Sequence, residues 1–495
     1  MKAQKIVESS IGMFRTTLLL TSSLGCASLL AEITTPSFIS DGMVLQQKTK
    51  AKLWGKATPN QSLSAKLGSQ TLTTNVDKNG DWSLTFENLK ASTSPQTLTL
   101  SSGDDEKIIN DVLVGEVWIA SGQSNMEWTM AKTDGAQEAK TANDPLLRVY
   151  VSSNKAIGTP QYDLKGNWKA TAPENTPSFT AVGYQFAKKL RSELQVPVGI
   201  IETAWGGKPV EAFTSAEAIA QLPAAKALAE NKAKQMANYQ KAMAKRPSDA
   251  KGKAPANPGN NPNLHSNIYN GHIAPLVGYG IRGAIWYQGE SNARPNTAPL
   301  YADLQAGMIQ DWRTRWGHEF PFYYVQLANF AKWRNGLNWV IVQDQQRRML
   351  QSVKHTGMAV TNDIGDPKDI HPKNKTDVGK RLARWALHND YGKTNLVVSG
   401  PLFASAKTTS NSIEISFDHA EGLTTRDKHA PKTFEIAGAD GKWAPANAKI
   451  QGNKVILTSD TISKPIHARY AWSNNPTEAN LVNKEGLPTS CFTTQ

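Results

Sequence analysis

The sequence predicts an α/β protein in which a central parallel sheet lies between an N-terminal and a C-terminal β-sandwich-like region. Three observations support this prediction. Short runs of alternating apolar and polar residues, separated by Gly, Asn and Asp turns, occupy residues 32–110 and recur over residues 396–495. Between them, over residues 111–395, apolar strands alternate with amphipathic helices. Such alternation is typical of a parallel sheet that is covered by helices on both faces.

The N-terminal segment, residues 1–31, has the pattern of a signal peptide. Positively charged residues precede a short apolar run over residues 16–30, as in an export signal. The run is too short to span a bilayer, and no other stretch approaches twenty apolar residues, so we expect no membrane span. We therefore expect an exported protein, either periplasmic or extracellular.

The chain has only two cysteines, Cys26 and Cys491. Cys26 leaves a lipoprotein anchor open as an alternative, although Ser23 stands where a lipoprotein signal has an aliphatic residue. If Cys26 is removed with the signal peptide, Cys491 has no partner and the mature chain contains no disulfide.

The two outer regions contain short predicted strands. In the first region the turn Asn79-Gly80-Asp81 lies between two of them and is typical of a hairpin. The strands are predicted at 51–54, 62–67, 82–86 and 97–100 in the first region and at 412–417, 433–436, 454–457 and 467–471 in the second.

The central region contains longer elements. Val182, Phe186, Leu190 and Leu194 recur every four residues and form one face of a predicted helix. Strands are predicted at 112–120, 198–203, 283–287, 322–327 and 357–361, and helices at 182–194, 300–316, 339–353 and 377–388.

A basic helical insertion is predicted at residues 215–262. The formal net charge of the chain is +13, and residues 226–253 hold many of its Lys and Arg residues but only Glu230 and Asp249 as acids. We interpret this segment as a solvated helix with a flexible tail. No basic-aromatic motif of a nucleic-acid-binding module accompanies it, so we expect no nucleic-acid partner.

Polar segments follow four of the five predicted central strands. In a doubly wound sheet the carboxyl ends of the strands share one edge, where ligands bind. Residues hundreds of positions apart are therefore expected to meet there. The segments are Gly122-Gln123-Ser124-Asn125, Trp205-Gly206-Gly207-Lys208, Gln288-Gly289-Glu290-Ser291-Asn292 and the stretch from Asp363 to Pro372.

Ser124 is the candidate nucleophile among these residues. A hydroxyl at the mouth of the crevice, beside backbone N–H groups, has the surroundings that acyl transfer needs. A serine also needs a neighbouring base, most often histidine. Of the nine histidines, only His371 follows a strand of the sheet and precedes a helix at the same edge. We therefore expect His371 to be the base.

The motifs together resemble the sialate O-acetylesterase family of SGNH-type esterases. The resemblance rests on Gly-Gln-Ser-Asn-Met, Trp-Gly-Gly, Trp-Tyr-Gln-Gly-Glu-Ser-Asn and Asp-Ile-His-Pro-x-Asn-Lys, and it extends from about residue 36 to the C-terminus. It implies a flavodoxin-like core, Ser-His catalysis without a cofactor or metal, and an O-acetylated sugar or glycan, especially sialic acid, as the substrate.

The resemblance also implies roles for individual residues. Ser124 would attack the acetyl carbonyl, and His371 would carry the proton. The oxyanion donors would be the N–H of Ser124, the N–H of Gly206 (or Gly207) and the amide of Gln288, with Asn292 as the alternative to Gln288. The residues taken as substrate contacts are Gln123, Asn125, Gly207, Glu290 and Asn292.

The sequence departs from the family at two places. Family members commonly have an aspartate three residues before the histidine, but here Asp369 stands two before it, so Asp369, Asp366, Asp363 or a backbone carbonyl remains open as the partner of the imidazole. Of these, Asp369 is taken as the third catalytic residue. The second departure is His272, where the family usually has Met.

Three other functions remain open. The chain is alternatively an acetylxylan-type polysaccharide deacetylase, because related families share the Gly-Gln-Ser-Asn turn. It is alternatively a carbohydrate-binding protein without catalysis. A glycosidase needs two carboxylates, for which Glu116 and Glu290 are the candidates, but that scheme leaves Ser124 and His371 unused.

Overall fold

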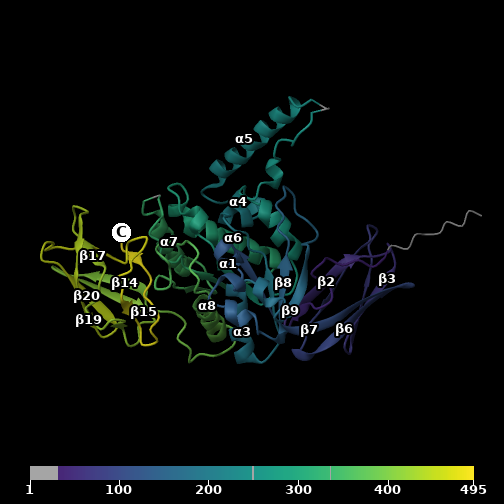
Figure 1. The fold of residues 1–495 in the computed structure, drawn as a ribbon, viewed down its shortest axis with the longest axis horizontal. Coiled ribbons are helices and arrows are strands. Elements are labelled where there is room, and N and C mark those ends of the chain that lie inside the picture. The colour runs from purple at the N-terminus through teal and green to yellow at the C-terminus, as the bar shows by residue number, and fades with distance from the viewer. Residues whose placement is uncertain (1–31, 248–249, 335) are drawn as a thin grey trace, which may run out of the picture.

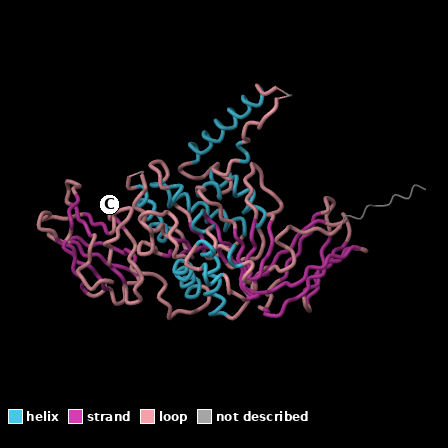
Figure 2. The backbone as a smooth tube through the Cα atoms, in the orientation of Figure 1, coloured by secondary structure: helices cyan, strands magenta, loops and turns pink. Residues whose placement is uncertain are grey.

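The computed structural model describes residues 32–247, 250–334 and 336–495. The predicted signal peptide, residues 1–31, and the alternative lipid anchor at Cys26 lie outside the described residues. A helix-rich centre lies between two strand-rich ends (Figure 1, Figure 2). The large sheet contains parallel strands, and smaller antiparallel sheets accompany it, so the expected α/β class is confirmed.

The N-terminal end consists of two groups of antiparallel strands. In one group β3 (Ser62–Leu67) pairs with β4 (Gln70–Asn75) and with β6 (Ser92–Ser102). In the other group β2 (Ala51–Lys56) pairs with β5 (Asp81–Phe86). Buried and solvent-accessible residues alternate along β2 and β3, because one face of each strand lies against the core.

The predicted hairpin at Asn79-Gly80-Asp81 is wrong. This turn joins β4 to β5, but β4 pairs with β3 across the short turn at Gly68, and β5 pairs with β2. Gly68 has a φ of 57°, which glycine adopts without a steric penalty. The turn at Gly68 joins β3 and β4 into a hairpin. The Asn79-Gly80-Asp81 turn therefore connects two different pairs of strands, β3–β4 and β2–β5.

The 18-residue strand β7 (Asp105–Gly122) connects the N-terminal end to the centre. It pairs with β6 in antiparallel orientation and with β1 (Val44–Gln46) in parallel orientation. Its last part lies between β10 (Val198–Glu202) and β11 (Gly283–Tyr287), both of which are parallel to it. The predicted boundary between residues 110 and 111 therefore falls inside one continuous strand.

The central sheet has the order β13-β12-β11-β7-β10-β8-β9. β13 (Thr356–Ala359), β12 (Phe322–Val325) and β8 (Asp144–Ser152) are parallel to their inner neighbours, and β9 (Gly166–Thr171) is antiparallel at the edge. The five strands predicted from the sequence take the spatial order 2-1-3-4-5, with the change of direction at β7. The strands β8 and β9, which extend the sheet beyond β10, are not among those predicted from the sequence.

The α-helices of the described chain differ greatly in length. The longest, α5, lies in the predicted basic insertion, and the other long ones, α3, α6, α7 and α8, coincide with the helices predicted at 182–194, 300–316, 339–353 and 377–388. The helices are α1 (Ser124–Glu127), α2 (Ala136–Ala139), α3 (Ala181–Leu194), α4 (Ala216–Ile219), α5 (Ala225–Ala244), α6 (Tyr301–Trp316), α7 (Asn338–Ser352) and α8 (Thr376–Asn389). In the described parts of the chain, no helix has both the length and the apolar character needed to cross a membrane.

Helices cover both faces of the central sheet. Trp118 of β7 contacts Phe186 of α3, with ring centroids 5.0 Å apart, and Trp286 of β11 contacts Trp312 of α6 at 6.3 Å. Trp286 is in register with Ser121, which is three residues from Trp118 on β7. Because side chains alternate along a strand, the two tryptophans point to opposite faces. Helix α8 packs against α3, and α7 packs against α6.

The basic insertion contains α5, which projects from the centre of the molecule (Figure 1). None of its 20 residues is buried. The Lys232 ammonium holds the helix to the body through hydrogen bonds to the carbonyl of His265 (3.1 Å) and to Asn267 Oδ1 (3.2 Å). Because none of its residues is buried, α5 is exposed to solvent, as expected of this segment.

The C-terminal end contains two four-stranded antiparallel sheets and one pair of short strands. Their inward residues form a second hydrophobic core, to which Val340 of α7 contributes. The first sheet has the order β14 (Leu402–Thr408), β15 (Ile413–Asp418), β20 (Lys454–Thr458) and β19 (Asn447–Gln451). The second has the order β18 (Trp443–Pro445), β17 (Phe434–Ala437), β21 (His467–Tyr470) and β23 (Phe492–Thr493), and β16 (Thr424–Thr425) pairs with β22 (Leu481–Val482).

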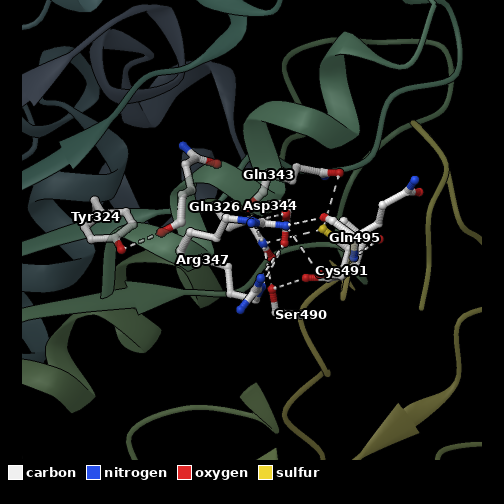
Figure 3. Close-up of polar contacts among 11 residues, drawn as sticks. Tyr324, Gln326, Gln343, Asp344, Arg347, Ser490, Cys491 and Gln495 are labelled. Carbon is white, nitrogen blue, oxygen red and sulfur yellow. Dashed lines mark hydrogen bonds and ion pairs between the residues drawn. The ribbon is translucent and has the colours of Figure 1, made fainter. Parts of the chain in front are cut away.

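The last residues of the chain attach this end to the centre (Figure 3). Gln326, which follows β12, donates a 2.7 Å hydrogen bond to Ser490 Oγ. Arg348 of α7 donates to the carbonyl of Gln495 at 3.0 Å. Cys491 is a buried free cysteine at this contact, and burial raises the pKa of its thiol. Cys491 is therefore a core residue with an unreactive thiol.

A buried carboxylate, that of Glu116, joins the centre to the N-terminal end. Glu116 is 1% exposed. It accepts hydrogen bonds from the amides of Gln46 (3.0 Å) and Gln47 (2.7 Å), from Arg282 Nε (2.9 Å) and from the hydroxyl of Tyr391 (2.8 Å). Three segments that are far from Glu116 in the chain therefore bond to its carboxylate.

Glu116→Gln is expected to lower the free energy of unfolding by about 3 to 5 kcal/mol, because it leaves the guanidinium of Arg282 without its counter-charge in a largely buried position. Urea titration followed by tryptophan fluorescence measures the change. Glu414→Gln is the matched control, since it removes an exposed pair with Lys454 (2.7 Å) and should cost less than about 1 kcal/mol. Equal losses in the two variants would contradict a structural role for Glu116.

Candidate active site

The candidate site lies at the carboxyl end of β7, where the strand order of the sheet changes direction. The strand ends at Gly122, whose φ is 131°, and a Cβ at this position would overlap the backbone carbonyl of Tyr287. Glycine is required here, and it lets the chain turn at once from β7 into α1. Ser124 is the first residue of α1, so its N–H is one of the donors at a helix start that have no acceptor within the helix.

Ser124 and His371 are in contact although 247 positions separate them in the sequence. His371 Nε2 lies 2.8 Å from Ser124 Oγ, which is a hydrogen-bond distance. The imidazole stacks on the indole of Trp128, with ring centroids 4.6 Å apart and an interplanar angle of 15°. Because the stacking fixes the plane of the imidazole, Nε2 stays directed at the hydroxyl. This is the arrangement of a serine with an adjacent base.

Among the three aspartates considered as partners of His371, Asp369 faces the imidazole. Its Oδ1 lies 3.6 Å from Nδ1 and accepts a 2.9 Å hydrogen bond from the backbone N–H of His371. Asp363 is paired with Arg381 through two hydrogen bonds of 2.7 Å. Asp366 accepts hydrogen bonds from backbone N–H groups of its own loop. The last two carboxylates are therefore engaged elsewhere.

The surroundings of His371 keep its imidazole neutral at pH 7. Burial holds the pKa of His371 below its ordinary value of 6.5 and is the largest effect. The carboxylate of Asp369 opposes this shift in pKa, and the ammonium of Lys375 reinforces it. A neutral imidazole can accept the proton of a serine hydroxyl, so the electrostatics suit a general base.

Asn125 connects three loops directly behind Ser124. Its Nδ2 donates to Glu290 Oε1 (2.6 Å) and to the carbonyl of Ile370 (3.0 Å), and its Oδ1 accepts a 2.6 Å hydrogen bond from Lys375 Nζ. All three polar side chains are buried. Burial raises the pKa of Glu290 and lowers the pKa of Lys375 to about 7. Asn125 and Glu290, which were taken as substrate contacts, therefore lie beneath the nucleophile and bond to each other.

Gln123, Gln288 and Asn292 form a second buried network. Gln288 Nε2 donates to Asn292 Oδ1 (2.7 Å) and lies 3.2 Å from Gln123 Oε1. Gln288 Oε1 accepts a 2.7 Å hydrogen bond from the hydroxyl of Tyr301, and Asn292 Nδ2 donates a 2.8 Å hydrogen bond to the carboxylate of Glu211. The structure thus brings the three predicted residues together: the amide hydrogens of Gln288 and Asn292 are bonded within the network and to the loops, and Gln123 takes part through its Oε1, which accepts. An oxyanion role for Gln288 or Asn292 stays a prediction.

The Trp-Gly-Gly loop after β10 lies against the nucleophile. A Cβ at Gly206 would stand 3.3 Å from Ser124 Cβ, and the Gly206 N–H donates a 2.8 Å hydrogen bond to Glu127 Oε2. Gly207 has a φ of 70° and faces open space. Gly206 therefore adjoins Ser124, and the role of either glycine as an oxyanion donor stays a prediction.

His272, the second of the two departures named from the sequence, is held by hydrogen bonds and by stacking. Its Nε2 accepts a 2.9 Å hydrogen bond from the N–H of Lys155, its Nδ1 lies 3.3 Å from the carbonyl of Thr203, and its ring stacks on Trp205 at 5.6 Å. Burial lowers the pKa of His272 to about 4, so the ring is neutral. It fixes Trp205 next to the glycine loop.

The geometry excludes the glycosidase alternative. Glu116 is in register with Val198, the first residue of β10, whereas Glu290 follows β11 beyond Tyr287, which is in register with Gly122. The six residues from Glu116 to Gly122 span about 20 Å of strand. Glycosidase carboxylates lie about 5 to 9.5 Å apart. The two glutamates stand at opposite ends of the sheet and cannot flank one bond.

Three residues of the site were not assigned a role from the sequence. They are Trp128, which stacks on the base, Glu127, which binds the glycine loop, and Lys375, which lies behind the nucleophile. Each lies in or directly after a motif, so the sequence could have predicted that these residues lie near the site. It could not have predicted their roles, because stacking and burial depend on contacts with distant segments.

The chain is similar to known carbohydrate esterases in sequence. The sequence model of the family described as carbohydrate esterase, sialic acid-specific acetylesterase, matches residues 114–250 and 262–388. The chain is 28% identical to a sialate O-acetylesterase of Homo sapiens over 487 residues, which cover 89% of this chain and 88% of that protein. It is 27% identical to a sialate O-acetylesterase of Rattus norvegicus over 496 residues, with 89% and 90% covered.

A solved structure is similar over almost the whole chain. The crystal structure of a carbohydrate acetylesterase from Xanthomonas citri has a TM-score of 0.83 and 37% sequence identity, and it covers 94% of this chain and 99% of that chain. The two strand-rich ends therefore have counterparts in a relative, as the centre does. Since the family model matches more than half of the chain and includes the segments of Ser124 and His371, the chain belongs to the sialic acid-specific acetylesterase family of carbohydrate esterases and is a carboxylic ester hydrolase.

Proposed function

We propose that this chain is an SGNH-type serine esterase with a flavodoxin-like core, which removes acetyl groups from sugar hydroxyls, above all those of sialic acids. The observation that carries the proposal is the 2.8 Å distance between Ser124 Oγ and His371 Nε2 at the switch point of the sheet. The 2-1-3-4-5 strand order supports the fold, and the names of the curated relatives support the substrate class. The signal-peptide pattern of residues 1–31 supports export.

In the first half of the reaction, Ser124 Oγ attacks the carbonyl carbon of the acetyl ester while its proton passes to His371 Nε2. The carbonyl oxygen becomes an oxyanion in the tetrahedral intermediate. The bond to the sugar oxygen then breaks, and that oxygen takes the proton from His371. The acetyl group remains on Ser124 as an acyl-enzyme.

In the second half, water attacks the acyl-enzyme and gives its proton to His371 Nε2. A second tetrahedral intermediate collapses, Ser124 Oγ leaves with the proton from His371, and acetate is released. Asp369 stabilises the imidazolium that forms in each half, from its position 3.6 Å from Nδ1.

The oxyanion is stabilised by backbone donors at the start of α1 and in the glycine loop. The N–H of Ser124 is free of helical acceptors, and the N–H of Gly206 becomes available when it exchanges Glu127 Oε2 for the oxyanion. Gln288 and Asn292 support these donors by holding Gln123, the residue that precedes Ser124.

Acetylated xylan is the second candidate substrate. The relative from Xanthomonas citri is named a carbohydrate acetylesterase, without reference to sialic acid, and it has a higher sequence identity to this chain (37%) than the sialate O-acetylesterases of Homo sapiens and Rattus norvegicus (28% and 27%). Both substrates undergo the same chemistry at Ser124, so they differ only in the sugar that the site admits.

Ser124→Ala and His371→Ala are each expected to lower kcat by about 10⁴-fold or more, and the double variant should be no worse than either, because the two residues act as one unit. Acetate release from O-acetylated sialic acid, acetylated xylan and p-nitrophenyl acetate measures the loss. His429→Ala, at an exposed histidine of the C-terminal end, is the matched control and should retain full activity.

Two results would contradict the esterase. One is a wild-type protein that releases no acetate from any of the three substrates, and the other is a Ser124→Ala variant that remains active. If the wild type binds sugars but releases no acetate, the result supports the alternative of a carbohydrate-binding protein without catalysis. The ratio of kcat/KM for the two sugar substrates decides between sialic acid and xylan.

The pH profile tests the partners of His371. In the wild type, kcat/KM should fall with decreasing pH below about 6.5, because a protonated imidazole cannot accept the proton of Ser124. Asp369→Asn removes the attraction that favours imidazolium, so the acidic limb should move to lower pH, and kcat should fall by up to about 10⁴-fold. Lys375→Met removes a nearby cation, so the same limb should move to higher pH.

Opposite shifts in the two variants are the diagnostic result, since general damage to the site does not produce them. Lys373→Met, at an exposed lysine of the same loop, is the matched control and should leave the limb in place. An unshifted limb and near-normal turnover in Asp369→Asn would rule out Asp369 as the partner of His371.

A further inference from the structure

A pocket of about 560 Å³ lies beside the glycine loop and takes no part in the mechanism above. Gly207 lines it, and the preceding residue, Gly206, lies against Ser124. Ser291 also lines it, and its backbone N–H donates a 3.2 Å hydrogen bond to Gln123 Oε1. Two lining residues of the pocket, Gly207 and Ser291, therefore lie in loops that contact the turn carrying Ser124.

The first half of α5 forms another wall of this pocket. Its lining residues are Ala227, Leu228, Asn231 and Gln235, and spacings of three and four place them on one side of the helix. A 3.1 Å hydrogen bond from Asn261 to Gln235 Oε1 fixes this side of the helix to the following loop, and Gln235 Nε2 donates a 3.1 Å hydrogen bond to Asn231 Oδ1. The Nδ2 group of Asn231 and the second N–H of Gln235 are the donors that these two bonds leave for a ligand. The second half of α5 projects away from the centre, as Figure 1 shows. The insertion thus reaches the pocket with one short face.

The chemistry of the lining suits a sugar. Amide side chains come from α5 (Asn231 and Gln235) and from the loops opposite (Asn263 and Asn296). An amide offers both donors and acceptors, which matches hydroxyl groups on neighbouring ring carbons. Leu228 adds apolar surface for the C–H faces of a ring. The volume lies within the usual range of small-molecule sites, about 300 to 1,000 Å³.

We infer that this pocket binds the sugar unit linked to the acetylated sugar, so that α5 makes the enzyme prefer acetyl esters on oligosaccharides to those on free monosaccharides. The inference rests on the proposed esterase function, because it places the acetyl group at Ser124 and the rest of the glycan against α5. A monosaccharide fills the space at Ser124 only and gains nothing from the pocket.

The double variant Asn231→Ala/Gln235→Ala tests the inference. The matched control is Asn238→Ala/Gln240→Ala, which removes two amides from exposed positions of the same helix outside the pocket. The substrates are p-nitrophenyl acetate, free O-acetylated sialic acid, O-acetylated sialyllactose and acetylated xylotriose. Thermal unfolding of both variants checks that the fold is intact.

We expect the pocket variant to lose about tenfold in kcat/KM on an acetylated trisaccharide, because two hydrogen bonds to the second sugar are missing. Its kcat/KM for p-nitrophenyl acetate and for the free acetylated monosaccharide should stay within about twofold of the wild type. The control variant should match the wild type on all four substrates. Loss on sialyllactose alone or on xylotriose alone identifies the kind of glycan that the pocket accepts.

Two results would overturn the inference while the esterase stands. One is an unchanged kcat/KM of the pocket variant on both trisaccharides, and the other is an equal loss on all four substrates. Inactivity of the wild type on all four substrates would instead overturn the proposed function. Calorimetric titration with deacetylated sialyllactose and xylotriose adds a readout apart from catalysis, in which the pocket variant should bind one of them about tenfold more weakly than the wild type.

Discussion

The hydrogen bonds of Asn125 hold together the loops on which the site depends. This side chain follows Ser124 directly, and it bonds to Glu290 after β11, to the carbonyl that precedes His371 and to Lys375 before α8. One amide therefore links the loop of the nucleophile to the loop of the base. Only an amide donates from one end and accepts at the other with so short a side chain, and here both ends are used.

This arrangement places a lysine and a glutamate out of contact with water. Burying either charge alone costs several kcal/mol, and a buried pair contributes little net stability even when its geometry is good. Asn125 lies between the two side chains and bonds to both, so each has a polar partner. The contribution of Lys375 and Glu290 is a defined geometry, because each keeps a hydrogen bond to Asn125 and so links its own loop to the loop of Ser124. The same lysine also disfavours protonation of His371, which links the support of the site to its chemistry.

Strand β7 has a comparable role at the scale of the whole molecule. It pairs with strands of the N-terminal end, and its last residues form the middle of the central sheet and end at the nucleophile. The buried carboxylate of Glu116 lies on this strand at the entrance to the central sheet. The N-terminal end is therefore part of the same hydrogen-bonded structure as the site. The C-terminal end is attached differently, through side chains of α7 and the segment after β12 (Figure 3).

Local patterns in the sequence were sufficient for most of the central strands and long helices and for the choice of Ser124 and His371, although they did not reveal β8 and β9. The strand predicted at 283–287 coincides with β11, and the helix predicted at 300–316 differs from α6 by one residue. Hydrophobic periodicity and turn residues act over a few positions, and they are visible in any single sequence. The expectation that Ser124 and His371 meet followed from one topological rule, because both residues follow strands of one parallel sheet.

The sequence by itself thus determined most of the central strands and long helices, and which polar residues stand at the ends of those strands. The tertiary structure alone decided how these pieces pair. It joined β4 to β3 instead of β5, placed Glu116 far from Glu290, engaged Asp363 with Arg381 so that Asp369 faces the base, and buried Lys375. The physical reason is common to all four: strand partners, ion pairs and burial depend on contacts between residues far apart in the chain, and no local pattern encodes them.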